Sequence, residues 1–441
     1  MDHEKTTSRK WYQAVGPGII TACVVIGPGS ILSSSKVGAT QGFDMLWLIF
    51  VSCIFMMFFM TMGAKLGVVL TKSVGDTVTE QAGRWLAVAI GVGVFFISAA
   101  YQFGNNLGVH SAFRSLGVSA SLSIVLVILF NALSVSFLYL FKNMYKALEK
   151  IMMGFVGLLL FCFAINLFNV KPDLGDLFSG FVPQSGAFGD ISVLALVGTT
   201  FVISAAYFQA YLAQQKGWSK KDLKDGLLDA RVGTSIMFCI TIMLICTAAA
   251  QLRGKDLASA EDVAAGLNET LGESANLLFC IGLFSAAYSS FLVNSMIAGF
   301  ILSDGLGLGS KPSDAAPKHL TTVVLLTGMI VALSVVQFGF KPVNLIVMAQ
   351  AVTVVFAPLL GIVLLWLTNN RAVMGEDRNG VATNIFASLG CLLLIAISYY
   401  MVVEKIPASL GYRSKAEIHI EQKPSGDNKP GALTQASNYD D

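Results

Sequence analysis

The four residues Gly27-Pro28-Gly29-Ser30 interrupt an apolar stretch, residues 16–32, that otherwise has the length and composition of a membrane-crossing helix. Proline lacks a backbone N–H and its ring clashes with the preceding helical turn, and glycine weakens the helix further. Inside a bilayer, the peptide groups that such a break leaves unpaired are tolerated only beside a cavity, a ligand or other protein groups. The sequence therefore predicts a first span made of two half-helices that face a binding pocket.

The composition indicates a polytopic membrane protein. Hydrophobic residues make up 55% of the chain, charged residues 13%, and the mean hydropathy is +0.70. Soluble domains have about 45–50% apolar and about 25% charged residues. With about 20 residues per span, we expect an all-α protein with eleven transmembrane helices. The expected spans are 15–36, 46–70, 85–110, 122–141, 151–168, 191–213, 232–250, 277–302, 320–336, 345–367 and 385–403.

Lysine and arginine are distributed unevenly between alternate loops. The loops on the side of the N-terminus carry 17 of these residues and those on the other side carry five, not counting the C-terminal tail. Because cytoplasmic loops carry the excess of positive charge, we expect a cytoplasmic N-terminus in the plasma membrane and, after an odd number of spans, a C-terminus on the opposite face. The predicted organisation is a tail of residues 1–12, a membrane domain of residues 13–404 and a flexible polar tail of residues 405–441.

Several classes of function lack support in the sequence. The seven cysteines all fall inside predicted spans and form no CxxC or CxxH pair, so we expect them to be packing residues. No nucleophile, metal cluster or carboxylate pair falls at a common depth, which disfavours an enzyme. We expect no cofactor and no nucleic-acid binding. The expected partners are the lipid bilayer and a small-molecule or ion substrate, and the oligomeric state is left open.

Several short motifs occur in a fixed order along the chain. They are Gly16-Pro17-Gly18, the interrupted first span, Gly63-Ala64-Lys65-Leu66-Gly67-Val68-Val69 in the second span, Ser285-Ala286-Ala287-Tyr288-Ser289-Ser290 and then Ala298-Gly299 in the eighth, and Gln350 in the tenth. From about residue 12 to 403 this order resembles the natural resistance-associated macrophage proteins, the Nramp family of divalent-metal transporters. The resemblance implies a LeuT-type core of two inverted five-helix repeats, about residues 13–170 and 188–370, followed by an eleventh helix. It also implies broken helices 1 and 6, and proton-coupled uptake of manganese, iron or related ions.

The chain departs from the family at the positions that the resemblance assigns to chemistry. The family's first break reads Asp-Pro-Gly-Asn and binds metal through its Asp and Asn, which correspond here to Gly27 and Ser30. The family's Met-Pro-His-Asn in span 6 falls on residues 202–205, from Val202 to Ala205, and a second His falls on Gln209. The two acidic residues of the family's proton path in span 3 correspond to Gln102 and Asn105. Of the usual metal shell, only Gln350 is left.

A divalent ion at the membrane midplane loses hydration and needs anionic or strongly dipolar oxygen ligands, and manganese and iron favour some nitrogen or sulfur as well. No Asp or Glu falls in the interior of a predicted span, since Asp44, Asp190, Asp229 and Asp304 lie near predicted ends. We therefore expect poor manganese and iron binding and no proton coupling by the family's route, and the metal ligands are left open. The expected substrate pocket contains Gly27, Gly29, Ser30, Thr199, Val202, Ser204, Gln209 and Gln350.

Lys36 follows three serines and lies six residues after Ser30, where the family usually has Gln. Its charge can replace a coupling ion, hold an anionic group of a substrate, or extend to the outer membrane interface. Three functions remain open. They are a divalent-cation transporter of altered selectivity, for example for hydrated magnesium; a transporter of a neutral, zwitterionic or anionic solute; and a non-transporting membrane sensor, which the polar lining of the spans disfavours.

Overall fold

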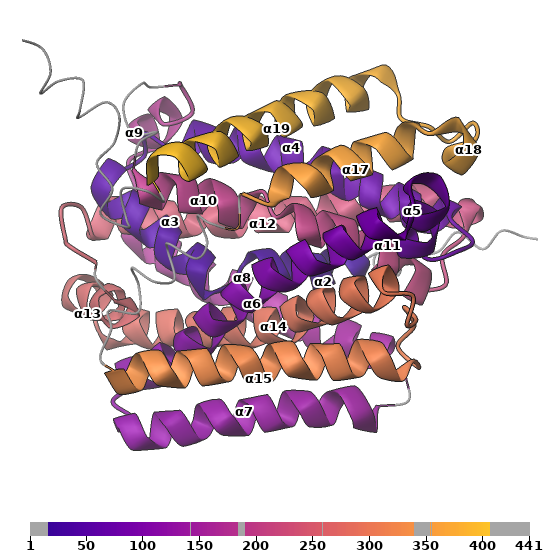
Figure 1. The fold of residues 1–441 in the computed structure, drawn as a ribbon. Helices are drawn as coiled ribbons and strands as arrows, with labels where there is room; N and C mark the ends of the chain where they lie inside the picture. Colours follow the sequence, from indigo (N-terminus) through magenta and orange to yellow (C-terminus); the bar gives the residue numbers. More distant parts are fainter. Residues whose placement is uncertain are drawn as a thin grey trace, which may run out of the picture.

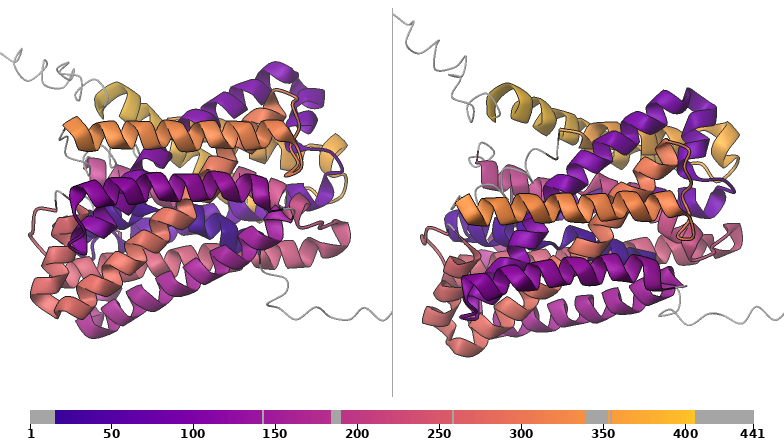
Figure 2. Two further views of the ribbon diagram at one scale, coloured as in Figure 1. Left: turned by 90° about the horizontal axis from the view of Figure 1, so that it is seen from below. Right: turned by 60° about the horizontal axis from the view of Figure 1, so that its bottom comes forward.

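The computed structural model describes residues 16–141, 143–183, 190–257, 259–338, 353 and 355–405. Over these residues the chain folds into α-helices, with one short 3-10 segment, Lys220–Asp222, and one π-helical turn, Met401–Lys405. The long helices run in roughly one common direction (Figure 1), and two further views agree (Figure 2). This arrangement is that of a helical membrane protein.

Two spans are interrupted and eight long helices surround them. The first interrupted span consists of α2 (Pro17–Val25) and α3 (Pro28–Gln41), bent by 56°, and the second consists of α10 (Ile191–Thr200) and α11 (Ile203–Gln215). The long helices are α4 (Leu46–Val69), α6 (Arg84–Ser115), α7 (Ala120–Leu140), α8 (Met144–Val170), α12 (Leu223–Gln251), α14 (Glu273–Gly305), α15 (Ala315–Phe338) and α19 (Val381–Tyr400). The shorter helices are α5 (Val74–Ala82), α9 (Leu174–Ser179), α13 (Ala260–Leu271), α17 (Ala357–Asn369) and α18 (Arg371–Met374).

The predicted all-α membrane fold with interrupted helices 1 and 6 is confirmed. Among the described residues, nine helices are long and apolar enough to cross a membrane, and ten if α2 and α3 count as one span. Of the tenth predicted span, residues 345–367, the structure describes mainly the part in α17, so the number eleven stays a prediction. The predicted tails, residues 1–12 and 405–441, lie outside the described residues apart from residue 405.

The two interrupted spans lie in the middle of the molecule. The apolar window of α10 and α11 is 100% buried, whereas that of α7 is 33% and that of α19 is 28% buried. α7 and α19 accordingly lie on opposite outer edges (Figure 1). A polar group beside either break is therefore enclosed by protein rather than by lipid.

Small residues bring the half-helices into backbone contact with their neighbours. A Cβ on Gly63 of α4 would lie 1.9 Å from the carbonyl oxygen of Ala206 in α11, and one on Gly67 would lie 2.3 Å from that of Ala210. On the other side, a Cβ on Gly18 of α2 would lie 2.2 Å from the carbonyl oxygen of Asp229 in α12. Such close approach is typical of small residues four apart in membrane helices. These contacts bring the half-helices close to the backbones of α4 and α12.

Candidate functional site: the two helix breaks

The break in the first span lies at Ile26 and Gly27, between α2 and α3. Because Pro28 has no N–H, the carbonyl oxygen of Val24 loses the partner that a continuous helix would give it. The hydroxyl of Ser290 in α14 donates to that oxygen at 3.2 Å. The break predicted from the sequence is therefore present, and α14 supplies the missing donor.

The break in the sixth span forms without a proline. Phe201 and Val202 leave the helical conformation, with φ/ψ of −100°/63° and −85°/85°. The carbonyl oxygen of Gly198, which a continuous helix would pair with the N–H of Val202, instead accepts the hydroxyl of Tyr101 in α6 at 3.1 Å. The hydroxyl of Thr353 donates in turn to Tyr101 at 3.4 Å. At this break, which contains no proline, the buried hydroxyl of Tyr101 thus pairs with the carbonyl oxygen that leaves the helical ladder.

Beside the first break, the structure brings together neutral polar groups. A Cβ on Gly27 would lie 3.0 Å from Oγ of Ser290 and 3.3 Å from Oδ1 of Asn105, so Gly27 faces α14 and α6. Ser30, in the first turn of α3 next to Gly29, is 2% exposed, and its hydroxyl has no partner among the described residues. As far as the described residues go, the lining of this break contains hydroxyl and amide oxygens and no charged group.

Beside the second break lies a cavity of about 10 Å³, lined by Val202 and Ser204 together with Tyr101, Phe201 and others. A cavity of this size holds at most one water. Two of the expected pocket residues, Val202 and Ser204, do line this cavity. Among the described residues, this cavity is therefore too small for a solute larger than water.

Two other expected pocket residues are engaged by hydrogen bonds within the protein. The hydroxyl of Thr199 donates to the carbonyl oxygen of Leu196 in its own helix at 3.0 Å, a common arrangement for Thr in membrane helices. Gln209 donates through Nε2 to Asp229 at 2.9 Å and accepts the hydroxyl of Thr21 at 3.2 Å. Gln350 lies outside the described residues. The substrate roles of all three stay predictions.

The two positions of the family's proton path lie in α6 and form an amide pair. Nδ2 of Asn105 donates to Oε1 of Gln102 at 3.3 Å. A Cβ on Gly328 of α15 would lie 2.5 Å from Cγ of Gln102, so Gln102 packs against α15, whereas Asn105 reaches toward Gly27. Asn105 therefore belongs to the break and Gln102 lies behind it.

Lys36 lies in the second half of α3 and is partly exposed. Among the described residues it forms no ion pair. The six residues that separate it from Ser30 correspond to a helix rise of about 9 Å. The Cα–Cβ bond of a helical residue tilts toward the helix N-terminus, which for Lys36 is the side of the buried serines.

Two of the four acidic residues that the sequence places near predicted span ends are buried in the structure. Asp229 is 0% and Asp304 is 2% exposed, although both lie near the ends of the predicted apolar segments. The helices continue beyond these segments, since α12 begins at Leu223 and α14 ends at Gly305. An Asp within two turns of an apolar segment is the sequence signal that could have found both. Among the described residues, however, no group of three or more His, Cys, Asp or Glu side chains could hold a metal ion.

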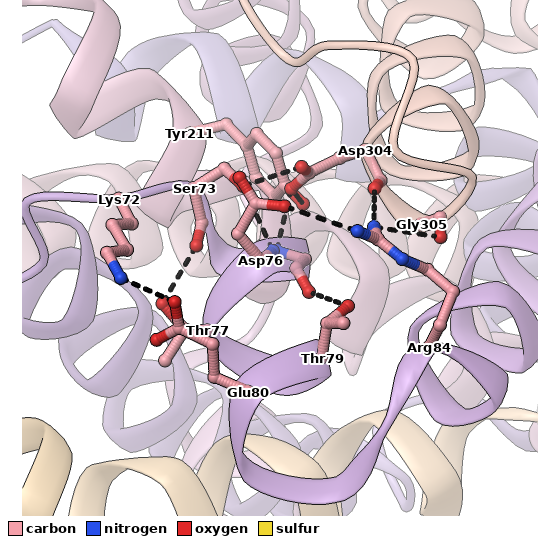
Figure 3. Close-up of polar contacts among 11 residues, drawn as sticks. Lys72, Ser73, Asp76, Thr77, Thr79, Glu80, Arg84, Tyr211, Asp304 and Gly305 are labelled. Carbon is pink, nitrogen blue, oxygen red and sulfur yellow. Dashed lines mark hydrogen bonds and ion pairs between the residues drawn. The ribbon is translucent and has the colours of Figure 1, made fainter.

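Asp304 joins three elements at one end of the molecule (Figure 3). Its carboxylate accepts the hydroxyl of Tyr211 in α11 at 2.6 Å, the hydroxyl of Ser73 at 2.6 Å and the backbone N–H of Gly75 at 2.7 Å. Nη1 of Arg84 at the start of α6 donates to the backbone oxygen of Asp304 at 3.3 Å. The carboxylate thus caps the N-terminal end of α5 and ties it to α14 and to the second interrupted span.

The described part of the chain is helical, its first and sixth spans are interrupted, and each break is capped by another span. These features define the LeuT-type transporter fold. Solved structures agree with this class. A manganese transporter from Eremococcus coleocola, in complex with an aromatic bis-isothiourea substituted compound, matches with a TM-score of 0.78 at 16% identity, covering 96% of this chain and 92% of that one. MhsT in complex with L-phenylalanine matches with a TM-score of 0.57 at 14% identity, covering 86% of this chain and 98% of that one.

The sequence identifies the family within that class. Residues 18–404 match the family model "Natural resistance-associated macrophage protein-like", and the chain belongs to the Nramp family. Among curated relatives, the divalent metal cation transporter MntH of Mycobacterium leprae is 25% identical over 404 residues, which cover 89% of this chain and 91% of that protein. MntH of Staphylococcus aureus strain Mu3 is 21% identical over 429 residues, covering 91% and 93%. The resemblance to this family that the sequence motifs indicate is confirmed.

Proposed function

We propose that the protein is a secondary transporter of divalent cations in the plasma membrane, with a selectivity that differs from that of a manganese transporter. Membership of the Nramp family and the match to MntH proteins along most of the chain support cation transport. The excess of Lys and Arg in alternate loops supports an N-terminus in the cytoplasm and a C-terminus on the opposite face.

One observation carries the altered selectivity: the lining of the first break, within the part of the chain that the structure describes, is neutral. The groups around Gly27 are the hydroxyls of Ser30 and Ser290 and the amide of Asn105. A dehydrated manganese ion needs anionic oxygen with some nitrogen or sulfur, and none of these groups supplies it. Magnesium keeps several of its waters when bound, so neutral oxygens can hold it through its hydration shell. We therefore assign the site to a largely hydrated cation.

The backbone at the two breaks supports the same assignment. The carbonyl oxygens of Val24 and Gly198, which the breaks release from the helices, accept hydrogen bonds from Ser290 and Tyr101. Each of these oxygens therefore already has a protein donor, which competes with an ion for it. A hydrated cation also needs far more room than the cavity of about 10 Å³, so entry requires the half-helices to separate.

A specific observation favours a second candidate, the transport of a neutral, zwitterionic or anionic solute. The hydroxyls of Ser30, Ser33 and Ser34 in α3 are buried and have no partner among the described residues. Lys36, on the same half-helix, forms no ion pair within the described part of the chain. Buried donors without partners beside a free ammonium suit a carboxylate-bearing solute.

Calorimetry and flux on the purified protein separate the candidates. We expect a Kd for Mn²⁺ weaker than about 1 mM, together with saturable Mg²⁺ entry into proteoliposomes reported by a trapped Mg²⁺ indicator. Micromolar binding of Mn²⁺ would contradict the proposed selectivity. If neither ion binds or enters and one member of an amino-acid panel gives a heat of binding, the result would favour the solute transporter. If no compound binds or enters, the result would favour the sensor.

A further inference from the structure

Asp229 is a buried carboxylate whose hydrogen-bond donors in the described part of the chain are all neutral. It is the seventh residue of α12, is 0% exposed and forms no ion pair among the described residues. Its Oδ1 accepts the backbone N–H of Gly16 at 2.7 Å. Its Oδ2 accepts the N–H of Gly18 at 2.6 Å and Nε2 of Gln209 at 2.9 Å. Three neutral donors therefore hold one negative charge inside the helical bundle.

These donors belong to the two interrupted spans. The N–H groups of Gly16 and Gly18 lie at the start of α2, where a helix has no internal partner for them and where a negative charge is stabilising. Gln209 lies in α11, and its Oε1 also accepts the hydroxyl of Thr21 in α2. Asp229 therefore connects α2, from the first interrupted span, and α11, from the second, to α12. The other end of α2 is the break at Gly27, where the chain bends by 56° and can act as a hinge.

Charged and titratable groups lie on several elements around Asp229, among them Asp225 and Arg231 of α12 itself and Lys36 of α3, which packs against α12. α8 contributes Tyr145 and Glu149, and α11 contributes Lys216, which pairs with Glu149 at 2.9 Å. α2 contributes only the thiol of Cys23. The ammonium of Lys65 in α4 donates instead to the carbonyl oxygen of Arg378 at 2.8 Å. Lys216 pairs with Glu149 and also acts electrostatically on Asp229, but among the described residues no cation forms an ion pair with Asp229.

We propose that Asp229 is a proton-binding site of the transport cycle and that its protonation releases the N-terminal end of α2. The inference rests on the proposed transport function. A proton from water on the side where α2 begins adds to one carboxylate oxygen, which becomes an O–H donor and can no longer face an N–H donor in the same way. The remaining bonds change from charge-assisted to neutral ones, which are roughly half as strong. α2 then swings on its hinge and opens the first break to that side.

The native Cys23 reports this motion without any substrate. It lies in α2, is 0% exposed, and its Sγ contacts the carbonyl oxygen of Met152 at 3.7 Å. The full-length protein in detergent is alkylated with N-ethylmaleimide at several pH values, and peptide mass mapping separates Cys23 from the other six cysteines. Each rate is divided by that of the same protein unfolded at the same pH, which removes the intrinsic pH dependence of thiol chemistry.

We expect the normalised labelling of Cys23 to rise about ten-fold between about pH 8 and pH 5 in the wild type, as the charge-assisted bonds are lost. Asp229→Asn should label at the high rate at every pH, and Asp229→Glu should restore the dependence. The matched control is Asp304→Asn, which removes the other buried carboxylate but no bond to α2, and it should keep the wild-type response. A flat wild-type curve, or a pH response that survives in Asp229→Asn, overturns the inference.

Two further measurements keep the result decisive. If Asp229→Asn fails to fold, Gln209→Ala keeps the carboxylate and removes one of its three donors, so the midpoint of the labelling curve should move to higher pH, and an unchanged midpoint counts against the proposal. Mg²⁺ flux into proteoliposomes tests the proposed function separately. A pH response of Cys23 without Mg²⁺ flux supports the proton site and contradicts the proposed substrate, whereas flux with a flat labelling curve does the reverse.

Discussion

The two helix breaks differ in how they are encoded. At the first, Pro28 removes a donor from the backbone, and the local sequence alone breaks the helix. At the second, neither Phe201 nor Val202 is a helix breaker, and the hydroxyl of Tyr101 takes the carbonyl oxygen of Gly198 from outside the span. Each cap also comes from the other repeat. Tyr101 in α6, in the first repeat, caps the break of the second repeat, and Ser290 in α14, in the second repeat, caps the break of the first repeat. A helix break can therefore result from the sequence of the span itself or from a side chain of a neighbouring helix.

The largest expected effect follows from adding charge to the first break only. Gly27→Asp combined with Ser30→Asn should strengthen Mn²⁺ binding by about 100-fold, because the new carboxylate reaches the groups that now surround Gly27. Titration calorimetry measures the gain. Ser34→Asp, a carboxylate one turn further along α3, is the matched control and should add none. If the double variant gains nothing, the charge of the first break alone does not decide selectivity, and the missing ligands of the second break are required.

Removing the external cap should affect the second break strongly. Tyr101→Phe leaves the carbonyl oxygen of Gly198 buried without this donor, at a cost of about 1–3 kcal/mol in the free energy of unfolding. Unfolding by SDS titration measures this cost. Tyr145→Phe is the control, because the hydroxyl of Tyr145 is buried without a partner among the described residues, and its loss should cost little. Equal costs in the two variants would show that the hydroxyl of Tyr101 does not hold the break.

Removing the cap from the first break should cost less. Ser290→Ala takes the donor from the carbonyl oxygen of Val24, but Pro28 keeps the helix interrupted, so we expect about 1 kcal/mol in the same SDS titration. Ser295→Ala lies on the same helix and removes a hydroxyl that bonds within α14, at 2.8 Å to the carbonyl oxygen of Leu292. It should cost less than Ser290→Ala. A cost for Ser290→Ala above that for Tyr101→Phe would reverse the contrast between the breaks.

The smallest change in the free energy of unfolding is expected when a proline is introduced at the second break. Ile203 is the first residue of α11, a position where proline is well tolerated, and the preceding Val202 is already outside the helical conformation. Ile203→Pro should change the free energy of unfolding by less than about 1 kcal/mol. Ala210→Pro, inside α11, should cost about 3 kcal/mol or more. A large loss from Ile203→Pro would mean that the second break needs its own N–H group.

The sequence predicted the spans and the first break because these depend on local features, namely apolar length and the Gly-Pro-Gly motif. The second break was predicted only through the family resemblance, since its cause is a tyrosine about 100 positions earlier in the chain. Asp229 and Asp304 were placed near predicted ends because hydropathy marks the apolar part of a helix and not its full length. The pocket was predicted in part. Ser204 lines a cavity at the breaks, whereas Gln209 serves the Asp229 network, which no single position in the sequence reveals.

The cluster around Asp304 has a consequence for following the protein at work. The carboxylate holds both Tyr211 of the second interrupted span and the amino end of α5, a short helix with exposed residues between α4 and α6. A tilt of α11 must therefore either drag α5 along or pull it off Asp304. A fluorescent dye attached to the outer side of α5 would then read out, from the aqueous surface, a rearrangement that takes place deep in the bilayer.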